Sequence, residues 1–207
     1  MRKPAYLIGV IVPFIAVTTM AFGAQNQLVD NTLQNFQIAF NGESNAHARY
    51  MAFATKADQE GYGEVASLFR AAAKAEEIHA KNHAEEIKKL GGTPEAKLET
   101  PVVKSTKENL ETAITGERYE RDLMYPDFRK QAWNLGNREA VKMFNYARNG
   151  EGEHAKLFEE AYGNLDSMRG RSRVYYVCIV CGYATKDLEF EKCHSCFSPK
   201  EKFEQVS

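Results

Sequence analysis

The chain has 207 residues, a length that allows one domain with a small appendage and a substantial core. Hydrophobic residues make up 43% and charged residues 27%, which is typical of a globular protein and excludes disordered, collagen-like and multi-span membrane chains. With 27 Lys and Arg against 28 Asp and Glu, the net charge of -1 provides no field that attracts a polyanion, so we expect no nucleic-acid partner.

The first segment differs from the rest of the chain, because residues 4–29 carry no charge and follow Arg2 and Lys3. A basic start, an apolar run and small residues up to Ala24 are the pattern of an export signal. Residues 1–24 are therefore predicted to be a cleaved signal peptide, with an uncleaved membrane anchor as the alternative. Either would place the protein in the periplasm or at a membrane rather than in the cytoplasm.

Apolar residues at alternating steps of three and four predict four amphipathic helices, which together form a bundle over residues 30–168. The predicted helices cover residues 32–60, 64–90, 106–134 and 138–162. The stretch 95–104 is long enough for a crossover connection, and Ser105 with Glu108 forms a capping box after it. Pro126 predicts a kink in the third helix.

Each apolar helix face carries a glutamate near its middle. These are Glu43, Glu76, Glu117 and Glu151. Four ionised carboxylates in one core would unfold a typical domain unless cations lay among them. In two helices a histidine follows three residues later, as His79 and His154, which places it on the same face. One Glu from each of two helices and Glu-x-x-His from the other two is the ligand set of di-iron and di-manganese bundles.

Oxygen and imidazole ligands without thiolate favour iron or manganese, with zinc as a surrogate. Glu120 is a seventh candidate ligand, or else a solvated carboxylate. Tyr50 and Tyr125 could donate hydrogen bonds to ligands or supply an electron to the oxidised site, with core packing as the competing role. His47 and His83 also face inward, and we interpret them as packing or ligand-supporting residues rather than ligands.

Gly150 and Gly152 flank Glu151 inside the fourth helix, where each glycine costs about 1 kcal/mol relative to alanine. They predict a π-type distortion or a close helix approach near the metals. Simple tolerance of glycine is the alternative.

The C-terminal residues 174–207 follow a short basic linker, 169–173, and have a β-rich composition. All four cysteines lie there, in two Cys-x-x-Cys pairs: Cys178, Cys181, Cys193 and Cys196. This spacing predicts a tetrahedral four-sulfur metal site. Zinc would make the site structural and iron would make it a one-electron carrier, and the spacing leaves both open. In an oxidising compartment, bound metal would protect these thiols from forming disulfides.

Several motifs together resemble the rubrerythrin family over about residues 33–204. They are Gly42-Glu-Ser44 with Arg49-Tyr50, the two Glu-x-x-His motifs, Glu117-Arg-Tyr-Glu120, Cys178-x-x-Cys-Gly-Tyr183, and Pro199-Lys200 with Phe203. The resemblance implies a mainly α fold, in which a ferritin-like four-helix bundle holds a non-haem di-iron site. A small C-terminal rubredoxin-like domain, β-rich and binding metal, would hold one iron in a four-cysteine site.

The resemblance also implies which residues bind iron. The di-iron ligands would be Glu43, Glu76, His79, Glu117, Glu120, Glu151 and His154, and the third iron would be bound by Cys178, Cys181, Cys193 and Cys196. One iron would shift between Glu120 and His79 as the site changes oxidation state. The family's homodimer would bring the cysteine module of one subunit close to the di-iron site of the other, since within one subunit the two are expected to be far apart.

The function that this implies is a peroxidase that reduces hydrogen peroxide to water in oxidative stress defence, with electrons passed from an unknown redox protein through the iron of the four-cysteine site. The alternatives are a ferroxidase or iron-handling protein that uses dioxygen, and a non-catalytic metal-binding protein with a zinc ribbon. Two features depart from the family pattern. His194 replaces the proline that usually follows the third cysteine, and the export signal is unusual for a cytoplasmic family.

Overall fold

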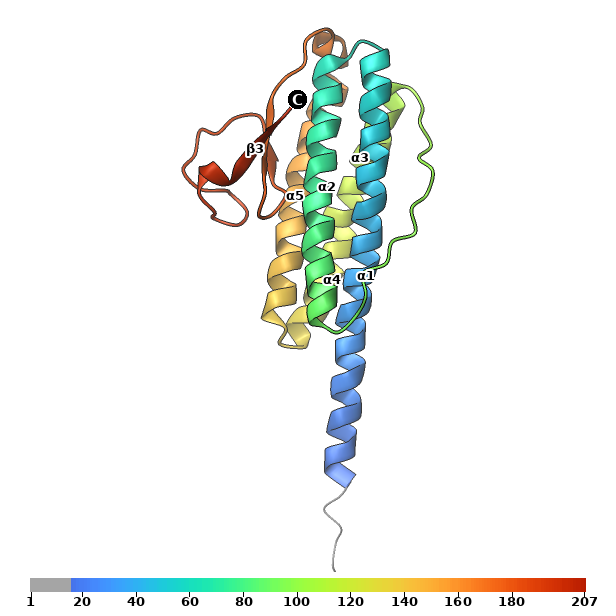
Figure 1. The fold of residues 1–207 in the computed structure, drawn as a ribbon, viewed down its shortest axis with the longest axis vertical. Helices are drawn as coiled ribbons and strands as arrows, with labels where there is room; N and C mark the ends of the chain where they lie inside the picture. Colours follow the sequence, from blue (N-terminus) through green and yellow to red (C-terminus); the bar gives the residue numbers. More distant parts are fainter. Residues whose placement is uncertain (1–15) are drawn as a thin grey trace, which may run out of the picture.

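The computed structural model describes the backbone of residues 16–207 and the side chains from residue 31 onward. It is a bundle of long helices with a small module on one side, so the predicted mainly helical fold is confirmed (Figure 1). The helices are α1 (Ala16–Gln59), α2 (Gly63–Lys89), α3 (Thr106–Tyr119), α4 (Tyr125–Asn134) and α5 (Arg138–Gly163). Within the described part of the chain, no helix has the length and apolar character needed to span a membrane. Most of the predicted signal or anchor, residues 1–24, lies outside the described residues.

Helix α1 begins well before the predicted start at residue 32 and extends past the end of the bundle (Figure 1). The prediction of that start was wrong because it relied on where the apolar stripe begins. Residues 24–41 contain neither proline nor glycine, so nothing in the sequence ends the helix ahead of the stripe.

The crossover predicted for residues 95–104 is confirmed as an extended connection between α2 and α3. Two asparagines one turn apart on α1 hold it. The Asn41 carbonyl Oδ1 accepts from the Lys97 backbone N–H at 2.8 Å, and the Asn45 Oδ1 accepts from the Glu99 N–H at 2.8 Å. The segment therefore lies along the bundle because side-chain amides replace the backbone partners that a helix or sheet would supply.

The third predicted helix is divided by a π-helical segment, Glu120–Met124, that joins α3 to α4. Pro126 lies just after this segment, and because proline lacks an N–H and its ring meets the carbonyl four residues earlier, it disturbs the turn that precedes it. The irregularity thus precedes the proline. Of the alternatives for Gly150 and Gly152, a π-type distortion is not what the structure has, because α5 is continuous through both glycines.

Two aromatic clusters fill the bundle, one on each side of the glutamates along the helices. One contains Tyr50, Phe53, Phe69 and Phe158, and the other contains Phe36, Tyr125, Phe128 and Phe144. Ring centroids within the clusters lie 4.3–6.4 Å apart, which is the separation at which aromatic pairs attract. The acidic middle of the bundle is therefore enclosed by apolar layers.

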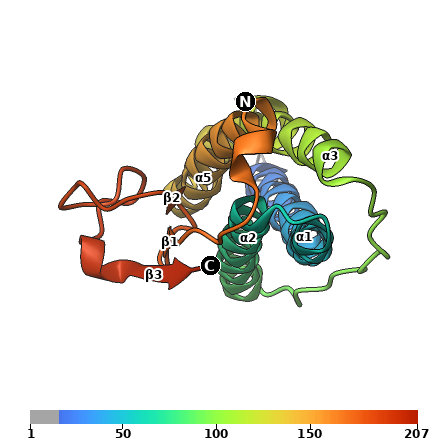
Figure 2. The same ribbon diagram turned by 90° about the horizontal axis from the view of Figure 1, so that it is seen from above.

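The C-terminal module is a three-stranded antiparallel sheet of order β2-β1-β3. Its strands are β1 (Tyr175–Cys178), β2 (Ala184–Thr185) and β3 (Phe203–Val206). Figure 2 shows the module beside α2 and α5. Tyr175, Val177 and Ala184 are buried in the same hydrophobic cluster as the bundle residues, so the module and the bundle share one core.

The basic segment 169–173 is fixed to the bundle and is not a free linker. The guanidinium of Arg169 lies 4.0 Å from the centroid of the Tyr62 ring, a cation–π contact. The Gly170 N–H donates to the Gly61 carbonyl at 3.0 Å, and Arg173 pairs with Glu64 at 3.2 Å. These contacts fix the point from which the module returns along α2.

The capping box at the start of α3 is confirmed, because the Ser105 side chain accepts from the Glu108 N–H while the Glu108 carboxylate accepts from the Ser105 N–H. We predict that Ser105→Ala lowers the free energy of unfolding by about 1 kcal/mol in urea denaturation of the metal-loaded protein. Thr115→Ala, an exposed change on the same helix, should shift it by less than about 0.5 kcal/mol. Equal losses in both variants would contradict the capping role.

Candidate metal centres

Four helices each send side chains into the acidic middle of the bundle. They contribute Glu43 from α1, Glu76 and His79 from α2, Glu117 from α3, and Glu151 and His154 from α5, all buried. Their ligand atoms form two groups of four, each within 4.8 Å: Glu43, Glu76, His79 and Glu151, and Glu76, Glu117, Glu151 and His154. Glu76 and Glu151 belong to both groups, so they are placed to bridge two ions.

The two histidines face these carboxylates with the same ring nitrogen. His79 Nδ1 lies 2.8 Å from Glu76 Oε2 and 3.0 Å from Glu151 Oε1. His154 Nδ1 lies 3.0 Å from Glu151 Oε2 and 3.2 Å from Glu76 Oε1. Each Glu-x-x-His motif therefore presents an imidazole and a carboxylate to the same point.

The electrostatics of the site favour positive charge. Burial raises the pKa of Glu43 well above its ordinary range, and the neighbouring carboxylates add to the rise. Burial and then Glu76 raise the pKa of Glu117 to about 8. Burial opposes a charge on His79, yet Glu151 and Glu76 outweigh it and raise its pKa to about 10. Because carboxylates outnumber histidines, the ionised site carries a net negative charge that bound cations would neutralise.

Hydrogen bonding within the site points to the same requirement. Several buried ligand atoms lie close to one another but make no hydrogen bond of good geometry among the described residues: Glu43 Oε2, Glu76 Oε1, Glu117 Oε2, both Glu151 oxygens and His154 Nδ1. Buried polar atoms are rarely left without a partner, and these converge on the centres of the two groups. The donor set of oxygen and imidazole nitrogen fits two iron or manganese ions.

Glu120, the seventh ligand implied by resemblance, is outside both groups. It begins the π-helical segment and is half-buried. Burial, followed by the charges of Glu151 and Glu117, raises the pKa of its carboxyl, which places it within electrostatic reach of the site. Exchange of one iron between Glu120 and His79 stays a prediction.

Both tyrosines hydrogen-bond to glutamates of the site and also pack in the aromatic clusters. The Tyr50 hydroxyl donates to Glu117 Oε1 at 2.5 Å, and the Tyr125 hydroxyl donates to Glu43 Oε1. Burial raises the pKa of both phenols, so they remain protonated donors. The structure thus places each tyrosine as a hydrogen-bond donor to one carboxylate.

The two other inward histidines lie outside both ligand groups. His47 Nδ1 is 2.8 Å from the Ala73 carbonyl. His83 Nε2 is 2.9 Å from the Tyr125 hydroxyl. Burial, and then the charge of His79, lower the pKa of His83 to about 3, so this ring is neutral.

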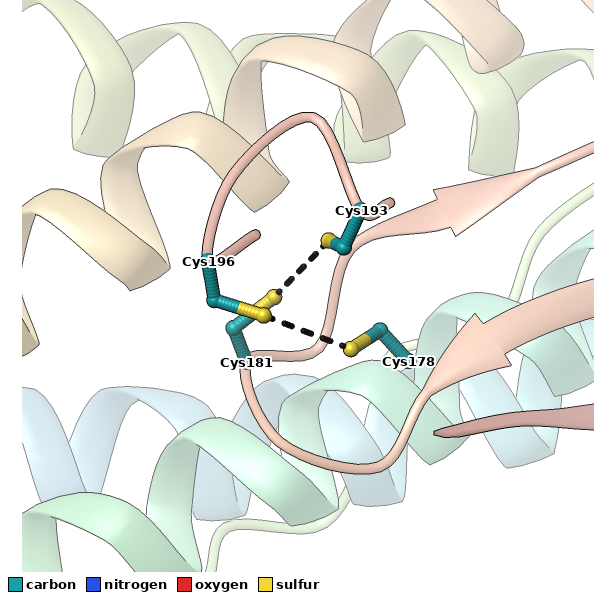
Figure 3. A group of neighbouring side chains, drawn as sticks. All are labelled: Cys178, Cys181, Cys193 and Cys196. Atoms are coloured by element: carbon teal, nitrogen blue, oxygen red, sulfur yellow. Dashed lines mark hydrogen bonds between the residues drawn. The ribbon is translucent and has the colours of Figure 1, made fainter. Parts of the chain in front are cut away.

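The four cysteines meet in the module, where their sulfurs point toward one another from two loops (Figure 3). The Cys178 and Cys196 sulfurs are 3.7 Å apart, and those of Cys181 and Cys193 are 3.6 Å apart. None forms a disulfide. A tetrahedron with metal–sulfur bonds of about 2.3 Å has edges of about 3.8 Å, so the sulfurs fit one four-coordinate iron or zinc.

The first cysteine loop lies directly on the two ligand histidines. His79 Nε2 is 3.0 Å from the Cys181 carbonyl oxygen, and His154 Nε2 is 3.3 Å from the Gly182 carbonyl oxygen. Both carbonyls accept from Nε2–H, which leaves the Nδ1 lone pair of each ring for a metal. The Asn82 side chain also donates to the Val180 carbonyl at 3.0 Å.

Sequence reasoning missed this contact between the module and the bundle. Backbone carbonyls carry no residue-specific signal, so Cys181 and Gly182 could not be recognised as partners of the histidines. Asn82 offered one clue, because it follows His79 by three residues on the same helix face.

His79 fits between two glycines. A Cβ atom at Gly150 would lie 2.8 Å from His79 Cε1, and one at Gly182 would lie 2.5 Å from His79 Cδ2. Gly182 also has a φ of +75°, which other residues rarely adopt. The close approach expected at Gly150 is therefore present, whereas a Cβ at Gly152 would make an ordinary contact with Arg121 at 3.5 Å.

The module contacts the bundle of its own chain. The expectation that the two metal sites are far apart within one subunit was therefore wrong, because the fixed segment 169–173 returns the chain along α2 to the histidines. Within the chain, the first cysteine loop already contacts both ligand histidines.

His194 is exposed, and its contacts are with aromatic residues of the module. Its ring centroid is 4.7 Å from that of Phe190, and its Nδ1 is 3.4 Å from the Tyr183 hydroxyl. The residue that replaces proline thus joins a small aromatic group beside the third cysteine.

We predict that Glu151→Ala abolishes binding of the metal pair and leaves the four-cysteine site intact, because Glu151 belongs to both ligand groups. The measurement is iron content per chain after anaerobic reconstitution, with ferric–thiolate absorption as the reading of the four-cysteine site. Glu153→Ala is the control, since this carboxylate pairs with Lys156 instead. Loss of both metal sites in Glu151→Ala would show that Glu151 is a structural residue.

Comparison with known proteins agrees with this geometry. The rubrerythrin family model matches residues 34–162. Nigerythrin of Nitratidesulfovibrio vulgaris is 38% identical over 176 residues, covering 84% of this chain and 86% of that protein. Rubrerythrin-2 of Clostridium acetobutylicum is 37% identical over 172 residues, covering 80% of this chain and 91% of that protein.

Solved structures give the same result. Nigerythrin in its fully reduced, all-ferrous state superposes with a TM-score of 0.78 at 37% identity, covering 84% of this chain and 86% of that one. A bacterioferritin of Desulfovibrio desulfuricans superposes with a TM-score of 0.64 at 25% identity, covering 69% of this chain and 84% of that one. Together with the ligand sets described above, these findings support a di-iron centre in the bundle and an iron in the four-cysteine site. The chain belongs to the rubrerythrin family.

Proposed function

We propose that this protein is a peroxidase that reduces hydrogen peroxide to water in defence against oxidative stress. The observation that carries the proposal is the contact between the two metal sites, where the Cys181 carbonyl meets His79 Nε2 at 3.0 Å. A one-electron site joined to a dinuclear site supports a cycle in which the dinuclear site is repeatedly re-reduced.

The reaction requires two electrons and two protons for each hydrogen peroxide, with cleavage of the O–O bond and release of two waters. Iron held by the two ligand groups of the bundle would supply the two electrons, and iron held by the four-cysteine site would allow their return one at a time from a donor redox protein. The chain itself supplies the ligand geometry, the proton positions and the exclusion of bulk water.

The carboxylates match this task, since four of them around two ions stabilise the more highly charged oxidised state. Tyr50 and Tyr125 keep their protons and donate to Glu117 and Glu43, which fixes the orientation of those ligands. The aromatic clusters on both sides keep bulk water from the site and strengthen these interactions.

Electron delivery depends on the path between the four-cysteine site and the bundle. Cys181 supplies both a sulfur to its own metal and a carbonyl oxygen to His79, while His79 presents Nδ1 to the acidic site. The path is thus a short series of covalent bonds and one hydrogen bond.

We also propose a homodimer, in which subunits that exchanged their modules would preserve the same contacts.

The ferroxidase alternative shares the bundle, as the likeness to bacterioferritin shows for the fold. A storage ferroxidase takes its electrons from incoming ferrous iron, so it has no use for an attached one-electron site. The cysteine module against the histidines therefore favours the peroxidase over the ferroxidase.

We predict that one equivalent of hydrogen peroxide, added to the anaerobically reduced and metal-quantified protein, rapidly restores the ferric–thiolate absorption in stopped flow. Dioxygen should restore it slowly. Faster recovery with dioxygen would favour the ferroxidase, and absence of a thiolate band would indicate zinc in the four-cysteine site and a binding protein without turnover.

A variant of the contact tests whether electrons reach the acidic site through it. Gly182→Ala places a methyl group against His79 and strains a positive φ, so it should displace the first cysteine loop. Recovery of the thiolate absorption should then slow while both metal sites stay loaded. Gly152→Ala, which makes only an ordinary contact, is the matched control.

The export of the protein is also a proposal, based on the uncharged run over residues 4–29 after Arg2 and Lys3. N-terminal sequencing of the protein from periplasmic and membrane fractions should find a chain that begins near Ala24. An intact Met1 in the membrane fraction would favour the anchor, and an intact Met1 in the soluble cytoplasm would contradict export.

A further inference from the structure

His83 is a buried histidine that belongs to neither ligand group. Its Nε2 lies 2.9 Å from the Tyr125 hydroxyl, and its ring centroid lies 5.6 Å from that of Phe36 and 6.0 Å from that of Phe144. Its Nδ1 has no hydrogen-bond partner among the described residues. A histidine that only filled space here would leave two polar atoms in an apolar cluster, which is a cost that phenylalanine would avoid.

The two halves of the bundle supply an internal comparison. His83 follows Glu76 by seven residues on α2, and Phe158 follows Glu151 by seven residues on α5. Phe158 packs edge-on against Tyr50 with ring centroids 5.4 Å apart, while His83 packs against Tyr125 at 5.9 Å. The chain thus places phenylalanine beside one tyrosine and histidine beside the other.

The direction of the His83 hydrogen bond follows from proton counting. The Tyr125 hydroxyl has a single proton, which it donates to Glu43 when that carboxylate is ionised as a ligand. Its oxygen then offers only lone pairs, so the partner nitrogen must carry a proton. His83 is therefore the Nε2–H tautomer, and its Nδ1 holds the lone pair without a partner.

We propose that His83 is a positioning residue that commits the Tyr125 proton to Glu43 and makes the two tyrosine–glutamate pairs unequal. An oxygen that accepts a hydrogen bond becomes a stronger donor through its own proton, so the series from His83 through Tyr125 to Glu43 is cooperative. At Tyr50 and Glu117 the equivalent place is occupied by Phe158, and the polar neighbour is the cationic Arg49, whose guanidinium lies 5.5 Å from the Tyr50 ring centroid and can only donate. Glu43 and Glu117 would therefore donate electron density unequally to the two metal positions, although both positions have the same kinds of ligand.

The inference rests on the proposed function only for its kinetic consequence, and its structural test requires no turnover. The full chain is loaded with zinc in all metal sites, which keeps it diamagnetic, and the side-chain ¹⁵N resonances of histidine are recorded. We expect His83 to show one tautomer with a proton on Nε2 and none on Nδ1. A proton on Nδ1 would overturn the proposal.

Tyr125→Phe removes the acceptor and retains the ring, so the His83 Nε2–H resonance should shift and the fixed tautomer should be lost. Tyr50→Phe is the matched control and should leave the His83 resonances unchanged. If Tyr125→Phe also leaves them unchanged, His83 is only a packing residue.

His83→Phe reproduces at Tyr125 the pair that the chain already has at Tyr50 and Phe158, so it is expected to fold and to bind zinc. The phenolic C–O vibration of Tyr125, identified by its loss in Tyr125→Phe, should shift in His83→Phe and not in His47→Phe. An unshifted vibration would contradict the positioning role.

With iron loaded, His83→Phe should slow the peroxide-driven recovery of thiolate absorption roughly fivefold, as expected for loss of one hydrogen bond in the series. If no variant and no wild-type protein responds to peroxide, the proposed peroxidase fails while the tautomer result still decides the role of His83. An unchanged rate in His83→Phe, with wild-type protein active, would overturn the kinetic consequence.

Discussion

Burial of four carboxylates in the middle of a helical bundle is the constraint on which the rest of this structure depends. Each of these glutamates would be unstable as an isolated ion in an apolar core. Two histidines facing them offset only part of the charge, and the unpartnered ligand atoms show what remains to be balanced. The aromatic clusters on either side raise the free-energy cost of the uncompensated negative charge, since they remove the water that would otherwise solvate the carboxylates. Cations are therefore part of the folded state of this domain as well as of its chemistry.

Each ligand histidine has different partners at its two ring nitrogens. One ring nitrogen points to the acidic site and the other to a backbone carbonyl of the first cysteine loop. Docking of the module thus selects the tautomer that a metal requires. The shared hydrophobic core and the fixed segment 169–173 hold the module in the one position where both carbonyls are in reach.

The sequence predicted those features that depend on side chains at a fixed spacing along the chain. The glutamates could be recognised because they interrupt apolar stripes, the capping box because Ser105 and Glu108 have fixed spacing, and the four-cysteine site because two Cys-x-x-Cys pairs wrap an ion. The start of α1 could not be placed from a stripe, because a helix continues until something ends it. Pro126 predicts an irregularity in this helix but not its form, which is a π-helical segment in the preceding turn.

Contacts made by backbone atoms could not be predicted from the sequence. The carbonyls that meet the histidines belong to residues selected for other reasons, namely a cysteine ligand and a glycine in a turn. The role of His83 required the three-dimensional pairing with Tyr125, although the equivalent spacing of His83 and Phe158 was visible in the chain.

The glycines on either side of His79 have a wider consequence. Because the imidazole fills the space between them, a single added carbon on either side must move the ring, and the ring is both a ligand of one site and the contact to the other. The protein therefore cannot adjust the separation of its two redox sites without also changing the ligand field of the first. Electron tunnelling falls steeply with distance, so the two glycines tie the speed of re-reduction and the geometry of the metal pair to one another, and descendants of this chain can change them only together.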